Sequence, residues 1–438
     1  MKFGWFSNLS LKQRKIYAAC YGAVAFDAMD STMFPLVIPS LIALLGITHP
    51  QAGALTSAGL VGAAIGGWGA GILADRIGRV RVVQLTLIWV CLFTFISAFV
   101  VSFHQLIAIR FLQGLGIGGE GAAAGVFISE AVASKLRGRV AASIQSAYAV
   151  GYAISVSLLP LVHLIVPGEW AWRVFFGIGC LPAIFVLYIR RSVDESDVFI
   201  YEQGKKKRTS GRPAFLEMFT GQYLASTLTG TCMSFGILGG AYVMITWLPT
   251  YLRMGLHLPV AYTSAFLGIN ILGSFTGPLL CGNVIDRLGR KRSIMLLLTC
   301  QAVNVAVYTF APLAGFITLI LGYFLGALQA AIASTLMPTF SELYPTRMRA
   351  AGAGFCTSVG RGFGSAIPAL VGVLSVNLKL ATAMGFCAIA AYAIGIISAS
   401  TLREASGVDL HEEIGDESSA QNNDDPQKKT AYQSTQER

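Results

Sequence analysis

Charged residues in this chain of 438 amino acids are gathered into clusters, and the stretches between the clusters are almost free of charge. Each uncharged stretch has about 20 residues, the length that an α-helix needs to cross the roughly 30 Å hydrocarbon core of a bilayer. Only 12% of the residues are charged, against about 25% in soluble domains. The pattern predicts a polytopic helical membrane protein, and it excludes a soluble enzyme, a disulfide-rich secreted domain and a disordered scaffold.

Twelve apolar segments can be recognised along the chain, and we predict that each forms a transmembrane helix. They cover approximately residues 16–45, 51–73, 82–102, 105–128, 140–163, 170–190, 221–249, 260–283, 293–311, 314–339, 350–373 and 378–401.

The basic residues predict the orientation of these helices. Of the 32 Lys and Arg residues, three lie in loops opposite the termini and two lie inside spans, which leaves 27 on the side of the termini. This asymmetry follows the positive-inside rule, so we expect both termini in the cytoplasm and a multi-pass protein of the plasma (bacterial inner) membrane. The net charge of +10 therefore reflects topology and does not indicate a nucleic-acid partner.

The eight cysteines all lie in apolar spans, without a Cys-x-x-Cys pair or a Cys/His cluster. We interpret them as small buried side chains and predict no metal site, no disulfide framework and no cofactor other than a proton gradient. The sequence also lacks a nucleotide loop and a nucleophile–base set, so we predict that the protein is not an enzyme. The basic N-terminal segment is interpreted as preceding a retained helix, not a cleaved signal.

The chain repeats itself. A loop Gly-x-x-x-Asp-Arg-x-Gly-Arg begins at Gly71 after the second span and again at Gly282, 211 residues later, after the eighth. The repeat predicts a cytoplasmic N-terminus (1–15), a six-helix half (16–190), a cytoplasmic central loop (191–220), a second six-helix half (221–403) and a disordered tail (404–438).

The repeated loops also predict a conformational latch at the cytoplasmic helix ends, because their acidic and basic side chains can bridge neighbouring helices while their glycines allow close approach and tight turns. For the basic residues, a role in topology alone is the alternative. The predicted latch residues are Gly71, Asp75, Arg76, Gly78 and Arg79, their repeats Gly282, Asp286, Arg287, Gly289 and Arg290, and the spaced pairs Glu130 with Arg137 and Glu342 with Arg349.

Five ionisable residues fall inside the predicted spans: Asp27, Asp30, Arg110, Glu120 and Arg361. Because a charge at the bilayer centre costs at least about 2.5–3.5 kcal/mol, such residues are expected to face a cavity and to have partners. Asp30 and Arg110 lie at similar depths, about 21–22 Å from the cytoplasmic edge at about 1.5 Å per residue, so we expect them to pair.

Asp27 lies one helical turn before Asp30, on the same helix face. Two carboxylates this close resist simultaneous ionisation, which predicts a proton-coupling device, with a static salt bridge as the alternative. Glu120 is either a second proton-handling group or a packing group.

Arg361 lies near the midplane of span eleven among glycines, and the C-terminal spans contain no acidic residue to neutralise it. Its guanidinium fork matches a carboxylate, so we predict that it binds an anionic substrate, with pairing to Asp27 in the empty state as the alternative. The uncharged side chains predicted to line the same cavity, with ordinary helix packing or interfacial anchoring as the alternative for each, are Gln145, Tyr148, Tyr242 and Gln329.

The two repeated loops and the six-plus-six layout resemble the major facilitator superfamily over roughly residues 15–403. The resemblance implies an all-α fold of twelve transmembrane helices in two pseudo-symmetric six-helix halves, with substrate held between them. The segments around Asp27-Ala-Met-Asp30, Leu115 to Glu120 and Gly360-Arg361 further resemble aromatic acid:proton symporters and their relatives for sialic acid and nicotinate. That resemblance implies transport roles for Asp27, Asp30 and Arg361.

These observations predict proton-coupled uptake of a small organic acid anion, such as an aromatic acid, by alternating access. The expected partners are a small carboxylate, protons and the lipid bilayer, and a monomer is the expected functional unit. A sugar or polyol porter, and proton-antiport efflux of an acid or drug, stay open as alternatives. Arg361 favours the acid, because a neutral substrate does not need it.

Overall fold

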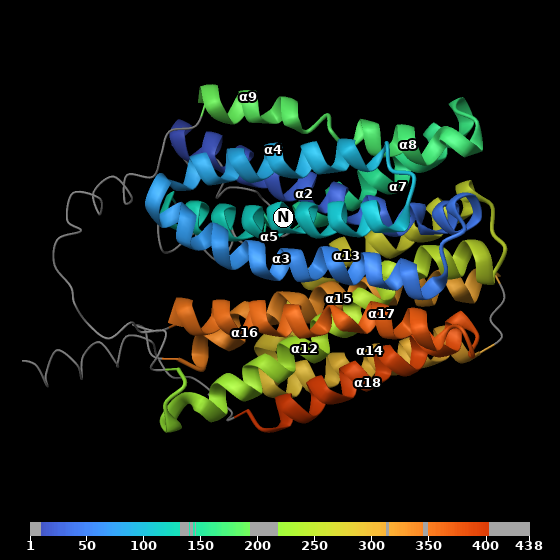
Figure 1. Cartoon of the computed structure of the whole chain (residues 1–438). Coiled ribbons are helices and arrows are strands. Elements are labelled where there is room, and N and C mark those ends of the chain that lie inside the picture. Colours follow the sequence, from blue (N-terminus) through green and yellow to red (C-terminus); the bar gives the residue numbers. More distant parts are fainter. Residues whose placement is uncertain are drawn as a thin grey trace, which may run out of the picture. The chain divides into compact units, whose positions relative to one another are not determined.

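A computed structural model describes residues 10–131, 140, 143–144, 146–192, 218–311, 315–344 and 349–402, which belong to one compact unit that ends at Leu402. This part of the chain forms helices and contains no strand (Figure 1). In chain order the helices are α2 (Leu11–Leu45), α3 (His49–Ile77), α4 (Arg79–Ser97), α5 (Phe103–Ala131), α7 (Ala147–Ile165), α8 (Gly168–Ile178), α9 (Ala183–Ser192), α12 (Gly221–Thr250), the π-helical turn η1 (Tyr251–Gly255), α13 (Val260–Leu288), α14 (Arg290–Phe310), α15 (Gly315–Glu342), α16 (Arg349–Gly364), α17 (Ala366–Leu374) and α18 (Leu380–Ser400).

The predicted spans coincide with these helices. Among the described residues, nine helical segments are long and apolar enough to cross a membrane, and the predicted spans 105–128, 260–283 and 350–373 correspond to α5, α13 and α16 with α17. Two spans are interrupted where one continuous helix was expected. Residues 179–182, which include Pro182, separate α8 from α9, and Ser365 separates α16 from α17.

Local sequence signals account for the first helix starts. Ser10 and Gln13 form a reciprocal capping box at α2, with the Ser10 amide donating to Gln13 Oε1 at 3.0 Å. Thr48 and Gln51 repeat the arrangement at α3, after Gly46 has turned the chain with a φ of 63°. These caps supply partners for amide groups that have no acceptor inside the helix, which matters most where little water is present.

Glycines hold α3 against α5. A Cβ at Gly62, Gly66 or Gly114 would collide with a backbone carbonyl oxygen of the facing helix. The second half repeats this seam between α13 and α15 at Gly273, Gly277 and Gly326, which lie 211 or 212 residues further along the chain. Because contact between helices in lipid comes from close packing and not from the hydrophobic effect, these glycines set the distance between the helices in both halves.

Helices from the two halves pack together, with α3 against α16 and α17, α2 against α12, and α7 against α13. At the predicted outer end, a Cβ at Gly53 would lie 2.6 Å from the carbonyl oxygen of Pro368, and one at Gly372 would lie 2.5 Å from that of His49. Ser57 Oγ donates to the Ser365 carbonyl oxygen at 2.5 Å. The outer ends of α3 and α17 are therefore in backbone contact.

The division into halves at residues 16–190 and 221–403 stays a prediction, because most of the loop between them and the tail 404–438 lie outside the described residues.

The glycine seam predicts a specific sensitivity. Gly66→Ala is expected to destabilise the protein by at least about 1–3 kcal/mol, because the added methyl group meets backbone that cannot turn away. Gly277→Ala should behave alike, since it occupies the repeated position. Gly69→Ala in the same helix is the control, because its Cβ would meet no atom within 4 Å. Melting temperatures in detergent measure the effect, and equal values for Gly66→Ala and Gly69→Ala would contradict the seam.

Candidate functional site

Asp30 is held in a closed hydrogen-bond cluster between α2, α4 and α5. Only 4% of its surface is exposed. Thr94 Oγ1 donates to Asp30 Oδ1, and Gln113 Nε2 donates to Asp30 Oδ2 at 2.6 Å. Gln113 Oε1 in turn accepts a hydrogen bond of 2.5 Å from Arg110 Nη1. We call Asp30, Thr94, Arg110 and Gln113 the Asp30 cluster.

The expected pairing of Asp30 with Arg110 is therefore indirect. Both residues are buried and the positive charge acts on the carboxylate, but Gln113 stands between them. The guanidinium also lies over the ring of Phe34, with its Cζ 4.2 Å from the ring centroid. An aromatic face stabilises a desolvated cation without neutralising it, so the charge of Arg110 remains available to the cluster.

Thr94 and Gln113 were missed by the sequence analysis. For Gln113 a signal was present, because it lies three residues after Arg110 and so shares its helix face. For Thr94 there was none, because its place beside Asp30 depends on how α4 packs against α2.

A second group gathers Asp27, Tyr148, Tyr242 and Arg361, and we call it the Arg361 cluster. These side chains come from α2, α7, α12 and α16, two helices from each predicted half, and each remains partly exposed. Arg361 is close enough for its charge to act on the other three members. Asp27 also lies within electrostatic reach of Asp30, so the two clusters are adjacent.

The Arg361 cluster is less completely paired than the Asp30 cluster, in which Arg110 Nε is the one buried atom without a hydrogen-bond partner among the described residues. Asp27 Oδ1 and Arg361 Nε are both buried and have no hydrogen-bond partner among the described residues. An unpaired buried polar atom costs about 1–3 kcal/mol, and more for a charged group. Such atoms in a partly exposed group indicate a place where another polar molecule binds.

Glycines let the backbone around Arg361 pack closely against α12 and α3. Arg361 lies in the last turn of α16, directly before the interruption at Ser365. A Cβ at Gly360 would press on Ser234 of α12, and one at Gly362 would lie 3.6 Å from Ala64 of α3. A cation is also favoured at this position, because the C-terminal end of a helix carries partial negative charge.

Gln329 lies in a different polar group. Its Oε1 accepts a hydrogen bond from the Tyr392 hydroxyl at 2.7 Å and a longer one from Gln301 Nε2 at 3.4 Å, which ties α15 to α18 and α14. None of its described contacts reaches the Arg361 cluster, so its predicted role in substrate binding stays a prediction.

The repeated loops are described only in part. Gly78 and Gly289 have φ values of 107° and 78°, so both make the expected tight turns. Gly71 does not make a close helix contact, because open space surrounds the place of its Cβ, and Arg76 is exposed. Arg290 is partly exposed at the start of α14. The side chains of the other predicted latch and site residues lie outside the described part of the structure. They are those of Asp75, Arg79, Glu120, Glu130, Arg137, Gln145, Asp286, Arg287, Glu342 and Arg349. The contacts of Gly282 lie outside it too.

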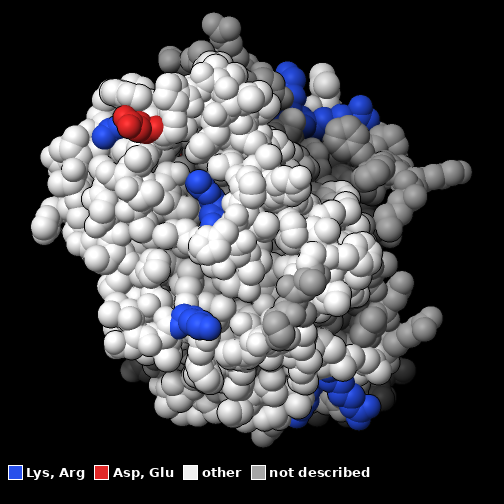
Figure 2. Space-filling model, turned by 90° about the vertical axis from the view of Figure 1, so that its right-hand side faces the viewer, with Lys and Arg blue, Asp and Glu red and all other residues white. Residues whose placement is uncertain are grey.

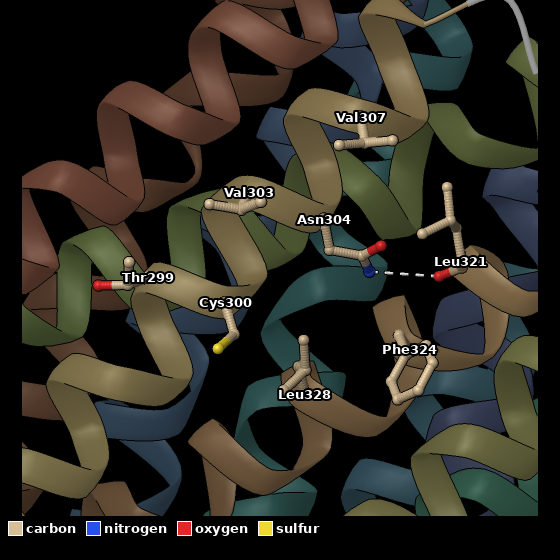
Figure 3. A pocket seen from close by; sticks show the side chains of 8 residues that line it. All are labelled: Thr299, Cys300, Val303, Asn304, Val307, Leu321, Phe324 and Leu328. Carbon is tan, nitrogen blue, oxygen red and sulfur yellow. Dashed lines mark hydrogen bonds between the residues drawn. The ribbon is translucent and has the colours of Figure 1, made fainter.

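One pocket lies apart from both clusters, between α14 and α15 (Figure 3). It has a volume of about 340 Å³, and most of its lining is apolar, as at Val303, Phe324 and Leu328. Asn304 lines it too and donates to the Leu321 carbonyl oxygen at 3.2 Å. With no acidic or basic side chain in its wall, this pocket does not match the charged site that the sequence predicts.

Solved structures share this arrangement of helices. A crystal structure of a D-xylose–proton symporter superposes with a TM-score of 0.73 at 18% identity, covering 90% of this chain and 99% of that one. An inward-open structure of the xylose transporter from E. coli gives a TM-score of 0.72 at 15% identity, with 91% and 98% covered. At this identity the likeness shows the fold alone.

Curated relatives are similar over nearly their whole length. The chain is 36% identical to a probable 4-methylmuconolactone transporter of Cupriavidus pinatubonensis, with 94% of this chain and 96% of the relative covered. It is 29% identical to the niacin transporter NiaP of Acinetobacter baylyi (79% and 83% covered) and 27% identical to the sialic acid transporter NanX of Escherichia coli (86% and 90%).

The family assignment follows from these findings. Residues 20–369 match the Major Facilitator Superfamily. The relatives are named as transporters, which confirms the prediction of a transporter and not an enzyme. With its fold and its apolar helices, the chain is a multi-pass integral membrane protein that belongs to the Major Facilitator Superfamily.

Proposed function

We propose that the protein imports a small organic acid anion together with protons across a plasma (bacterial inner) membrane, with both termini in the cytoplasm and no cofactor beyond the proton gradient. The observation that carries the proposal is the Arg361 cluster, in which a carboxyl and a guanidinium from opposite halves lie within electrostatic reach of each other and each has an unpaired buried atom. The relatives are named for 4-methylmuconolactone, niacin, sialic acid, cis,cis-muconate and 4-hydroxybenzoate, which supports an organic acid.

Arg361 binds the substrate carboxylate in this proposal. A guanidinium offers two parallel N–H donors that match the two oxygens of a carboxylate. The hydroxyl groups of Tyr148 and Tyr242 lie within reach of the same charge, one from each half, and their rings offer flat surfaces for an aromatic or unsaturated acid. A neutral sugar has no charge for the guanidinium of Arg361 to bind, which disfavours a sugar porter.

Proton coupling follows from competition for Arg361. In the empty protein Asp27 lies within reach of the charge of Arg361. An opposite charge at such range makes ionisation of a carboxyl less unfavourable. A bound substrate carboxylate takes over that charge. Asp27 then lies beside a second carboxyl, Asp30, without its counter-charge, and it takes up a proton. Substrate and proton therefore bind together, which is the requirement for symport.

The Asp30 cluster contributes to the proton uptake by Asp27. Asp30 has two hydrogen-bond donors and the nearby charge of Arg110, so its charge is compensated without Arg361. We propose that it acts as the fixed negative neighbour that makes a second ionised carboxyl at Asp27 unfavourable.

A binding screen tests the substrate class. We expect that at least one of niacin, 4-hydroxybenzoate and cis,cis-muconate raises the melting temperature of the purified protein, because a ligand at 100 times its Kd adds about 2.7 kcal/mol to the stability. Stabilisation by D-xylose and by none of the acids would contradict the proposal. The acid with the largest shift serves as substrate below.

Asp27→Asn is expected to separate transport from proton coupling. The amide cannot take up a proton, so cells or proteoliposomes should no longer accumulate the acid against its gradient, while exchange of internal for external acid continues. Concentrative uptake by this variant, collapsed by a protonophore as in the wild type, would contradict the role of Asp27.

Arg361→Gln is expected to weaken binding of the acid by about 10- to 150-fold, since a hydrogen bond to a charged group contributes about 1.5–3 kcal/mol. Lys379→Gln, which removes a basic residue from the loop before α18, is the control and should bind as the wild type does. Calorimetric titration measures the affinity of both variants for the acid. Equal affinity for the two variants would exclude a role of Arg361 in binding the substrate carboxylate.

Gln113→Leu is expected to lower both thermal stability and uptake. It leaves Asp30 Oδ2 and Arg110 Nη1 buried without their shared partner, at about 1–3 kcal/mol or more for each. Thr94→Ser keeps the hydroxyl that donates to Asp30 and should be close to the wild type. A Gln113→Leu protein that melts and transports normally would show that the cluster is dispensable.

A further inference from the structure

Few charges lie on the side of the molecule that the proposed orientation places outside the cell. This side contains three basic residues, Arg173, Arg253 and Lys379, and one acidic residue, Glu169. Figure 2 shows this face, on which scattered basic side chains interrupt a surface that is largely uncharged. Because the positive-inside rule disfavours Lys and Arg here, each basic residue calls for an explanation.

Arg173 has a structural explanation. Its Nη1 donates to the carbonyl oxygen of Ala98 at 2.6 Å, and its Cζ lies 4.2 Å from the ring centroid of Trp172. These contacts tie α8 to the end of α4, so the described partners of this guanidinium lie within the first half. Lys379 occupies the N-cap position of α18.

Arg253 is different, because its hydrogen bond crosses between the halves. It lies in η1, the π-helical turn at the outer end of α12, and its Nη1 donates to Ser40 Oγ of α2 at 3.2 Å. Ser40 is 8% exposed. His163 of α7 lies within electrostatic reach, and in the described part of the chain no carboxylate pairs with the guanidinium. Single π-turns in helices occur frequently at functional sites.

The surrounding contacts show that this arrangement belongs to an outwardly closed state. Ser57 donates to the Ser365 carbonyl oxygen, and Gly53 and Gly372 let α3 and α17 touch. When the halves separate on this side, Arg253 must leave Ser40. The guanidinium then loses its hydrogen bond to Ser40.

We propose that Arg253 is the outer capture site for the carboxylate of the incoming substrate, and that Ser40 replaces the carboxylate when the outer side closes. The inference rests on the proposed uptake of an organic acid and adds a second anion-binding residue on the path to Arg361. This replacement favours movement of the substrate from Arg253 toward Arg361, because Ser40 becomes the hydrogen-bond partner of Arg253 when the outer side closes and the substrate leaves. The position in the last turn of the helix also suits a cation, and Arg253→Lys keeps that contribution.

Initial rates of uptake of the acid chosen by the binding screen test the capture role. Arg253→Gln is expected to raise KM about tenfold, the loss of one moderate charge-assisted contact, with kcat close to the wild type. It should also reduce the rise of KM with added salt, because screening acts on exposed charges. Arg253→Lys should retain most of the salt dependence, and Ser40→Ala should retain all of it. A wild-type KM and salt dependence for Arg253→Gln would overturn the capture role.

A second measurement tests the contact with Ser40 without transport. Ser31→Cys places a thiol beside Tyr148, between the halves, where a membrane-impermeant maleimide reaches it from outside only when the outer side is open. Labelling of this variant is expected to increase when Arg253→Gln is added, and unchanged labelling would overturn the exchange with Ser40. If the wild type transports no acid, the proposed function and the capture role both fall, while the labelling result still decides whether Arg253 holds the outer side closed.

Discussion

A charge inside a bilayer is stable only when the protein itself supplies its partners, and this constraint organises the centre of the molecule. For Asp30 and Arg110 the shared partner is Gln113. Its amide nitrogen donates a hydrogen bond to the carboxylate, and its amide oxygen accepts one from the guanidinium. One side chain thereby provides a hydrogen-bond partner to two opposite charges without direct contact between them. The glycine seam fixes the distance of α5, which carries Arg110 and Gln113, from α3.

In the Arg361 cluster the protein does not supply every charged group with a partner, and this indicates a functional site. Its members remain partly exposed, and Asp27 Oδ1 and Arg361 Nε lack partners in the described structure. A protein that needed only stability would have replaced or paired these groups. Their placement on both halves means that any motion between the halves changes their distance, so the binding of an anion and the conformational change act on the same pair of charges.

Duplication explains why so much of the scaffold was predictable. The offset of 211 or 212 residues relates not only the repeated loops but also the glycines of α3 and α5 to those of α13 and α15. The duplication does not extend to the charges. Asp27, Asp30 and Arg110 lie in the first half, whereas Arg361 lies in the second. The two halves therefore have the same helix packing but carry different charged residues.

The sequence by itself determined the membrane environment, the spans, the repeat and the identity of the intramembrane charges, because hydropathy and charge placement act locally along the chain. It also placed Asp27 and Asp30 on one helix face, since helical spacing is local. Only the tertiary structure decided that Gln113 and Thr94 complete the Asp30 site, that Gln329 belongs to another group, and that Arg253 reaches Ser40 across the halves. Those contacts join residues far apart in the chain, and they depend on the packing distances and rotations of whole helices, which no local pattern encodes.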